Sequence, residues 1–235
     1  MKVSAPNNSF KMLYNAMAAT LKTVYMLSAV LALNDSEMVD NSVAVQSTIT
    51  PSFPIVSRSE WGAKPPKSPP EQMHEVPVPF VLIHHTYIPG YCNSTEACKE
   101  AMREMQRFHQ DDRGWNDIGY SFCIGCNGIT MEGRGWDSRG AHAPGYNERS
   151  IGICLIGDFR GGCTNTLPTV LPDDGMLNAV QGLINYGIDI GKISANYTLM
   201  GHRQVRNTEC PGDALFNLIQ HWAHFGDPEN KKHPV

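Results

Sequence analysis

The residues best suited to chemistry lie in one segment, 201–212, near the C-terminal end of the chain. It reads GHRQVRNTECPG, and seven residues separate the imidazole of His202 from the thiol of Cys210. Glycine and proline favour turns, so we expect a loop that leaves a short apolar strand over 197–200. Imidazole nitrogen and thiolate both bind zinc, and a catalytic zinc site uses three protein ligands and one position open to water. The segment therefore predicts two ligands of such a site.

A third ligand is expected at the end of a second apolar segment, 81–86, which reads VLIHHT. Here His84 and His85 end a buried-strand pattern, so two strand ends and one loop would converge. A His-His-Cys set also fits copper with an axial methionine, but such sites group these residues on one loop. No His or Met closely follows Cys210, so zinc is favoured. Taken singly, each His can also be a hydrogen-bonded structural residue, and Cys210 a small buried hydrophobe.

The elements that must position these residues follow from periodicity and turn chemistry. We expect buried strands over 80–85 and 150–157, a hairpin of 120–125 and 129–133 around Asn127-Gly128, and helices over 94–112, 172–189 and 213–222. Buried strands that alternate with long helices predict an α/β fold, in which helices cover a central sheet. A chain of 235 residues that is 41% hydrophobic and has no internal repeat predicts one domain.

Composition excludes several classes of protein. The formal net charge is -4 and no basic stripe occurs, which argues against nucleic acid as a partner. Charged residues make up 18% of the chain, too few for a disordered polyelectrolyte. No pair of carboxylates stands out as a glycosidase couple.

The N-terminal 50 residues differ from the rest of the chain. Lys11 and Lys22 precede an apolar run over 24–33, which suits the core of a signal peptide and is too short to span a bilayer. We expect 1–50 to be leader and linker, 51–228 the folded domain and 229–235 a tail, in a secreted protein. Because the polar part of the leader is long, a cytosolic extension and a weak membrane anchor are the alternatives. The glycosylation sequons at Asn93 and Asn196 are usable only if the chain is secreted.

Several motifs in one order resemble the peptidoglycan recognition proteins, a family related to the phage amidase-lysozymes. They read VLIHHT, CNSTEACKEAMREMQRFHQ, RGWNDIGYSF, MEGRGW, GAHAPGYNERSIGI and GHRQVRNTECPG, and the resemblance runs from about Ile55 to about Phe225. It implies a single domain with a mixed sheet of about five or six strands covered by about three helices. The chain resembles most the insect catalytic members, which degrade peptidoglycan and dampen immune signalling.

The resemblance also implies which residues form the site. Its Zn²⁺ ligands fall on His84, His202 and Cys210. Its catalytic tyrosine falls on Tyr120 and its second active-site position on Thr208, where the phage relatives carry lysine, so the proton donor stays open. Its substrate-binding positions fall on His85, His109, Gly114, Trp115, Arg134 and His142. From the residues alone, Tyr120 can be a core aromatic, His109 a cation at a helix end and Arg134 a solvated hairpin charge.

The implied reaction is hydrolysis of the amide between the lactyl group of N-acetylmuramic acid and L-alanine, without a covalent enzyme intermediate. Gly114, Trp115 and Arg134 match members that prefer diaminopimelic-acid-type peptidoglycan, whose extra carboxylate a guanidinium can hold. The alternative is a non-catalytic peptidoglycan-binding receptor, but such receptors usually lack the cysteine that Cys210 supplies. A directly antibacterial protein is a third interpretation. The expected partners are bacterial peptidoglycan and muropeptides, and no nucleic acid. We also expect no stable membrane span and a monomeric protein.

The remaining cysteines are sorted with the help of the same resemblance, which implies a disulfide between Cys92 and Cys98. The pattern C-x-x-C at Cys123 and Cys126 can indicate redox chemistry or half of a structural zinc site. It straddles a strand and a turn, however, so buried free thiols or an extra disulfide are expected instead. The pairing of these four cysteines is left open: Cys123, Cys126, Cys154 and Cys163.

Overall fold

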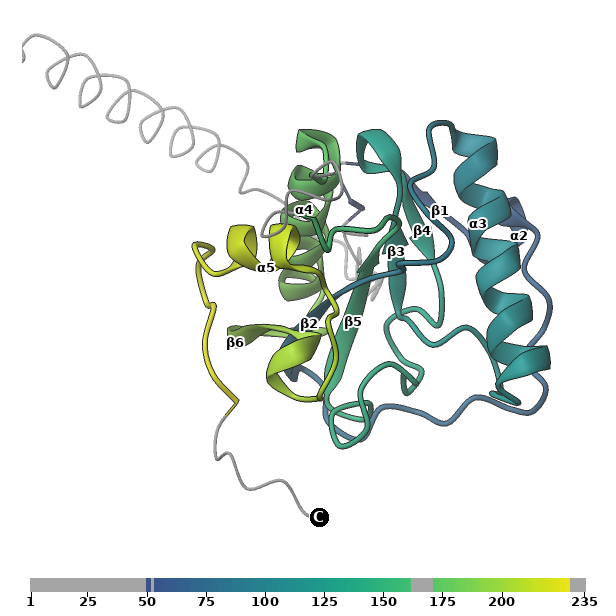
Figure 1. Cartoon of the computed structure of the whole chain (residues 1–235). Helices are drawn as coiled ribbons and strands as arrows, with labels where there is room; N and C mark the ends of the chain where they lie inside the picture. The colour runs from purple at the N-terminus through teal and green to yellow at the C-terminus, as the bar shows by residue number, and fades with distance from the viewer. Residues whose placement is uncertain (1–49, 52, 162–170, 229–235) are drawn as a thin grey trace, which may run out of the picture. The chain divides into compact units, whose positions relative to one another are not determined.

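A six-stranded sheet forms the centre of the computed structural model, which describes residues 50, 51, 53–161 and 171–228 (Figure 1). The strands are β1 (Ile55–Val56), β2 (Val78–His85), β3 (Phe122–Ile124), β4 (Thr130–Glu132), β5 (Ser150–Leu155) and β6 (Ile193–Gly201). Their order is β1-β4-β3-β5-β2-β6. Only the β3–β4 pair is antiparallel among the paired strands described. The predicted mixed sheet of five or six strands is confirmed.

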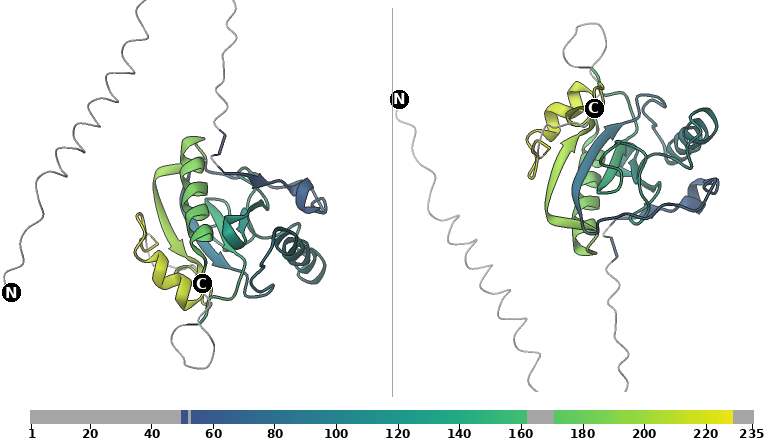
Figure 2. Two further views of the ribbon diagram at one scale, coloured as in Figure 1. Left: turned by 90° about the horizontal axis from the view of Figure 1, so that it is seen from above. Right: turned by 90° about the horizontal axis from the view of Figure 1, so that it is seen from below.

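Helices cover both faces of this sheet, as Figures 1 and 2 show. They are α2 (Arg58–Trp61), α3 (Thr95–Arg107), α4 (Asp174–Asp189) and α5 (Asp213–Ile219), with a π-helical turn η1 (Phe108–Asp112) and two 3-10 turns, η2 (Cys126–Gly128) and η3 (His202–Gln204). One apolar cluster joins the sheet to α4 and α5, and a second joins it to α3. This arrangement is the predicted α/β fold with about three main helices.

Strand β2 is buried on both faces, as its continuous apolar pattern predicts. Val81 and Ile83 belong to the cluster under α4 and α5, whereas Leu82 belongs to a cluster on the opposite face. Successive side chains of a strand point to opposite faces. The alternation therefore sends the imidazoles of His84 and His85 to different sides of the sheet.

Helix α3 follows the predicted stretch closely. Ser94 caps it by accepting the backbone N–H of Ala97, and the helix continues through η1 to Asp112. The Cys92–Cys98 disulfide closes the chain just where the helix begins, so the implied pairing is confirmed.

The hairpin also has the predicted turn. Asn127 (φ 54°) and Gly128 (φ 81°) both adopt the left-handed backbone conformation that an Asn-Gly turn between antiparallel strands requires. Helix α4 begins after an Asp173 cap, two residues later than predicted. Helix α5 ends at Ile219 and not at 222, because a turn follows in which Trp222 donates its backbone N–H to Ile219.

The cysteines outside the disulfide are reduced where the structure describes them. Cys123, Cys126 and Cys154 are buried free thiols, while Cys163 lies outside the described residues. The expected leader also lies outside them, and the domain boundaries at 50 and 228 stay predictions. Among the described helices, none has the length and apolar content needed to cross a membrane.

Candidate metal centre and substrate groove

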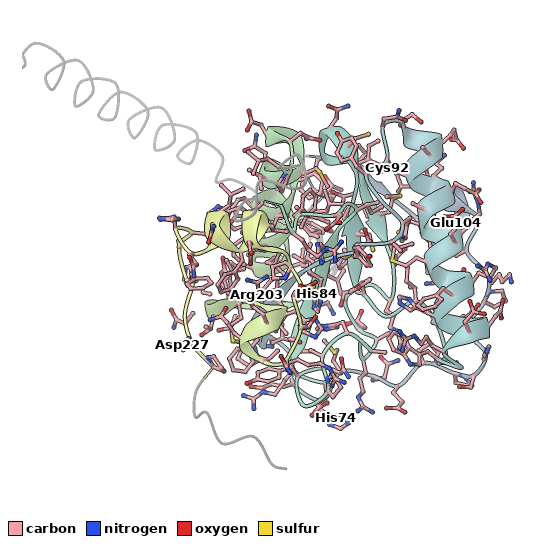
Figure 3. All side chains as sticks on the ribbon, viewed as in Figure 1. His74, His84, Cys92, Glu104, Arg203 and Asp227 are labelled. Atoms are coloured by element: carbon pink, nitrogen blue, oxygen red, sulfur yellow. A yellow bond between two sulfur atoms is a disulfide. The ribbon has the colours of Figure 1, made fainter. Side chains whose placement is uncertain are left out.

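Three soft ligands converge where neighbouring parallel strands end. Ile83 of β2 pairs with Gly201 of β6, so the next residues, His84 and His202, meet at the same edge of the sheet. Cys210 reaches the same point from the loop before α5. The ligand atoms of the three residues all lie within 4.8 Å of one another. Figure 3 labels His84 near the middle of the view, close to the C-terminal end of β2.

The geometry of these residues fits zinc. The Nδ1 atom of His84 lies 3.7 Å from Sγ of Cys210. Two atoms bound to one tetrahedral zinc at ordinary ligand lengths lie about 3.6 Å apart. The Nε2 atom of His202 is buried and has no hydrogen-bond partner among the described residues, as expected where an imidazole is reserved for another ligand. The set is therefore suited to a tetrahedral zinc ion with one open position.

Burial sets the protonation of these groups. It lowers the pKa of His84 well below its usual value, and repulsion by His202 and His142 in their protonated forms acts in the same direction. Burial likewise lowers the pKa of His202 to about 4, with a smaller effect of Arg206. Both imidazoles are neutral at pH 7, the form that binds a cation.

The thiol of Cys210 has the opposite shift. Burial raises its pKa to about 12, although the backbone N–H of His85 and the charge of Arg203 oppose this effect. The N–H of His85 lies 3.4 Å from the sulfur. A cation is what turns such a buried thiol into a thiolate, so metal binding here must release a proton.

Tyr120 lies against the centre from the start of the hairpin. Its ring centroid is 5.2 Å from that of His84. Burial raises the pKa of its hydroxyl well above the ordinary value, and the sulfurs of Cys154 and Cys210 add to this shift. The hydroxyl therefore stays protonated and can donate a hydrogen bond to negative charge that develops beside the centre.

A groove of about 570 Å³ runs along the same edge of the sheet. Of the residues predicted from the sequence, its lining includes His109, Trp115, Tyr120, His142 and His202. The ring of His109 stacks on Trp115 with centroids 4.6 Å apart. Its Nδ1 accepts the backbone N–H of Gly119, so the ring proton is on Nε2. The groove thus offers a flat aromatic wall and a fixed donor.

Besides the candidate ligands His84 and Cys210, four predicted residues do not belong to this lining. His85 faces the other side of the sheet, where its Nδ1 accepts the backbone N–H of Phe159. Thr208 lines a separate cavity of about 260 Å³ and accepts the backbone N–H of Cys210 through Oγ1, at 3.2 Å. Gly114 has a left-handed φ of 70° in the turn just before Trp115. These placements put the three residues outside the groove lining.

The fourth is Arg134, which lines a small cavity of about 80 Å³. Its guanidinium donates to three backbone carbonyls, those of Ile118, Asp117 and Arg139. It still acts on the groove electrostatically, because its charge lowers the pKa values of His109 and His142, in which burial is the larger cause. The guanidinium is thus held in a fixed position behind the groove.

The groove also contains polar residues that sequence reasoning missed, namely Arg113, Asn147 and Arg206. Each lies within a motif that carried the resemblance, so the signal was present. Charged and amide residues in loops are common, however, and their type alone did not mark them. Two arginines at the groove give it a positive character suited to the carboxylates of a peptide.

Known proteins are similar to this chain in sequence and fold. A profile of the family described as N-acetylmuramoyl-L-alanine amidase matches residues 74–213, which include all three candidate ligands. Peptidoglycan-recognition protein LB of Drosophila melanogaster is 52% identical over 171 residues, covering 73% of this chain and 69% of that protein. The chain belongs to the N-acetylmuramoyl-L-alanine amidase family of peptidoglycan recognition proteins.

Other members of this amidase family extend the comparison. The mouse N-acetylmuramoyl-L-alanine amidase is 43% identical over 178 residues, which are 75% of this chain but 32% of the mouse protein. The solved structure of Drosophila PGRP-LB is 51% identical, with a TM-score of 0.69 over 75% of this chain and 98% of that one. That of PGRP-LE in complex with tracheal cytotoxin is 40% identical, with a TM-score of 0.68 over 74% of this chain and 96% of that one. The fold described above is therefore the fold of this amidase family.

Proposed function

We propose that this chain is a zinc-dependent amidase that cleaves the bond between the lactyl group of N-acetylmuramic acid and L-alanine in peptidoglycan. The observation that carries the proposal is the convergence of His84, His202 and Cys210 within 4.8 Å, beside a groove of about 570 Å³. Membership of the amidase family and the similarity to peptidoglycan-recognition protein LB support both the reaction and the substrate class.

The two histidines and the cysteine would hold Zn²⁺. When bound, the ion would polarise the amide carbonyl and lower the pKa of a water molecule towards neutrality. Tyr120, kept protonated by burial, would donate a hydrogen bond to the oxygen on which charge develops. His109 would donate through Nε2 to a substrate carbonyl, and Trp115 would give the stem peptide a flat wall. Thr208 would act through Cys210, because it holds the backbone N–H of that ligand.

We propose a preference for diaminopimelic-acid-type peptidoglycan. Arg134 donates three of its five N–H groups to backbone carbonyls, which fixes the guanidinium. Two N–H donors are left for a carboxylate. PGRP-LE was solved in complex with tracheal cytotoxin, a monomeric diaminopimelic acid-type peptidoglycan, and a variant of PGRP-LB was solved with the same ligand. The likeness of this chain to both proteins supports the preference.

We also propose that the protein acts outside the cell and lowers the supply of peptidoglycan fragments to immune receptors. The Cys92–Cys98 disulfide supports secretion, because such bonds persist in oxidising compartments.

The reaction is tested by mass spectrometry of the products from a defined diaminopimelate muropeptide, with the wild-type chain and with Cys210→Ser. The proposal expects free muramic-acid sugar and a stem peptide with a new L-alanine amino terminus from the wild type, and intact substrate from Cys210→Ser. A wild-type chain that binds the muropeptide but leaves it intact would be a receptor, and the amidase proposal would be wrong.

A further inference from the structure

The candidate zinc ligand His84 makes a second contact through the ring nitrogen that does not face Cys210. Its Nε2 lies 3.0 Å from Nδ1 of His142, and both rings are buried. The rings meet edge to face, with centroids 4.9 Å apart and an interplanar angle of 84°. The Nδ1 atom of His84 meanwhile faces Cys210. The two nitrogens of one imidazole thus have separate partners.

Ser150, the next contact of His142, determines which of the two histidines donates in the hydrogen bond between His84 and His142. Ser150 donates its hydroxyl proton to the carbonyl of Tyr146 at 2.6 Å. Its oxygen is then an acceptor for Nε2 of His142, 3.5 Å away. His142 must therefore carry its proton on Nε2 and offer a lone pair at Nδ1. That lone pair can accept only from Nε2–H of His84, which leaves the lone pair of His84 on Nδ1.

The ring of His142 occupies a space shaped for it by two glycines. A Cβ added at Gly152 of β5 would lie 2.5 Å from Cδ2 of His142, and one added at Gly140 would come equally close. The side-chain amide oxygen of Asn147 also accepts a hydrogen bond from the backbone N–H of His142, at 2.8 Å. Close packing leaves the ring no room to turn away. Its orientation toward His84 is therefore built into the backbone.

We propose that His142 is a positioning residue for the metal centre, which fixes the tautomer and ring direction of His84. The inference rests on the proposed zinc site and adds to it. Partners of this kind hold the ligating nitrogen toward the metal, and their loss typically weakens metal binding about 10- to 100-fold. Both ring nitrogens of His142 are then used inside the protein. The ring of His142 also lines the groove.

The test compares zinc affinity, measured by competition with a chromophoric chelator, for His142→Asn and His142→Leu. The two replacements have nearly the same shape, but only asparagine keeps an acceptor near the position of Nδ1. We expect zinc binding about 10- to 100-fold weaker for His142→Leu and within about threefold of wild type for His142→Asn. The matched control is His109→Leu, which removes another buried groove imidazole without a contact to His84. Its zinc affinity should stay within about threefold of wild type.

Equal zinc affinities for His142→Leu and His142→Asn would overturn the inference while leaving the amidase proposal intact. A wild-type chain that binds no zinc would overturn both. If His142→Leu fails to fold, the wild-type protein labelled with ¹⁵N-histidine decides the matter without a substitution. Long-range ¹H–¹⁵N correlation should show the proton of His142 on Nε2 and that of His84 on Nε2. A proton on Nδ1 of His142 would contradict the proposed hydrogen bond.

Discussion

The Nε atom of Arg134 donates to the backbone carbonyl of Ile118 at 2.6 Å, only two residues before Tyr120 in the chain. The same guanidinium also holds the carbonyls of Asp117 and Arg139. Arg134, which the sequence predicts to contact substrate, thus also fixes the loop that leads to the candidate catalytic Tyr120. Any test of its role must separate these two functions.

We expect Arg134→Ala to lower the preference for diaminopimelate over lysine-type muropeptides. A charge-assisted hydrogen bond contributes about 1.5–3 kcal/mol, so the ratio of the two kcat/KM values should fall roughly ten- to a hundredfold. Loss of the hydrogen bonds from Arg134 to the backbone carbonyls should affect both substrates alike and so cancel in this ratio.

The ratio is measured with matched muropeptides that differ only at the third residue of the stem. Arg134→Lys is the matched control, since it keeps the charge but loses the planar fork and should recover part of the preference. An unchanged ratio in Arg134→Ala would mean that this side chain only supports the loop.

Thr208 offers a test of indirect support for a ligand. Its Oγ1 accepts the backbone N–H of Cys210, so Thr208→Val, which keeps the shape, should lower zinc affinity by roughly threefold to tenfold. Thr208→Ser keeps the acceptor and should bind zinc like the wild type. If Thr208→Val and Thr208→Ser have the same zinc affinity but differ in kcat, Thr208 acts on the reaction directly.

Replacing both Cys92 and Cys98 by alanine should destabilise the fold without removing zinc. The bond closes a loop at a sequence separation of 6, for which chain entropy predicts a loss of about 2 kcal/mol in the free energy of unfolding. Urea unfolding measures that loss, and metal analysis measures the zinc content. A fully stable double variant, or one that loses its zinc, would contradict this prediction.

The stability of the zinc-free protein should fall as the pH drops from 7 to 5. Burial lowers the pKa values of His85 and His109 to about 4, whereas an unfolded histidine titrates near 6.5. Between these values the unfolded chain binds more protons than the folded one, so acid favours unfolding by up to about 1 kcal/mol per pH unit for each histidine.

Urea unfolding at several pH values measures this slope. Measurements above pH 5 exclude the titration of carboxyls such as Glu71 and Asp158, whose pKa values are lowered by hydrogen bonds. The stabilisation from these carboxyls is lost only at lower pH. His109→Gln removes one titrating group and should flatten the slope. A free energy of unfolding that is constant between pH 7 and 5 would contradict the assigned burial.

Much of the fold could be predicted because local signals agreed with it. The apolar run of β2, the Ser94 cap and the Asn127-Gly128 turn each specify one element by a physical rule. Strand β6 was predicted only over 197–200, although it begins at Ile193. Ala195 and Asn196 are exposed at the edge of the sheet, so that part has no buried pattern to read.

The candidate site was predictable in its residue types but less so in their roles. His84, His202 and Cys210 do converge. Strand ends and glycine-bounded loops can be recognised in a sequence, and they indicate where ligands can meet. Spacing along the chain says nothing, however, of what a side chain contacts inside the fold. For that reason the hydrogen bond between His84 and His142, and the three carbonyls held by Arg134, became visible only in the structure.

The most direct test of the zinc-amidase account is the rate of product formation as zinc is added back to the chelated protein. Liquid chromatography and mass spectrometry would follow cleavage of one defined diaminopimelate muropeptide. The account predicts no cleavage without metal and a rate that rises to a plateau at about one zinc ion per chain, as a three-ligand site with one open position requires. Full activity in the chelated protein, or none after zinc binds at that stoichiometry, would contradict it.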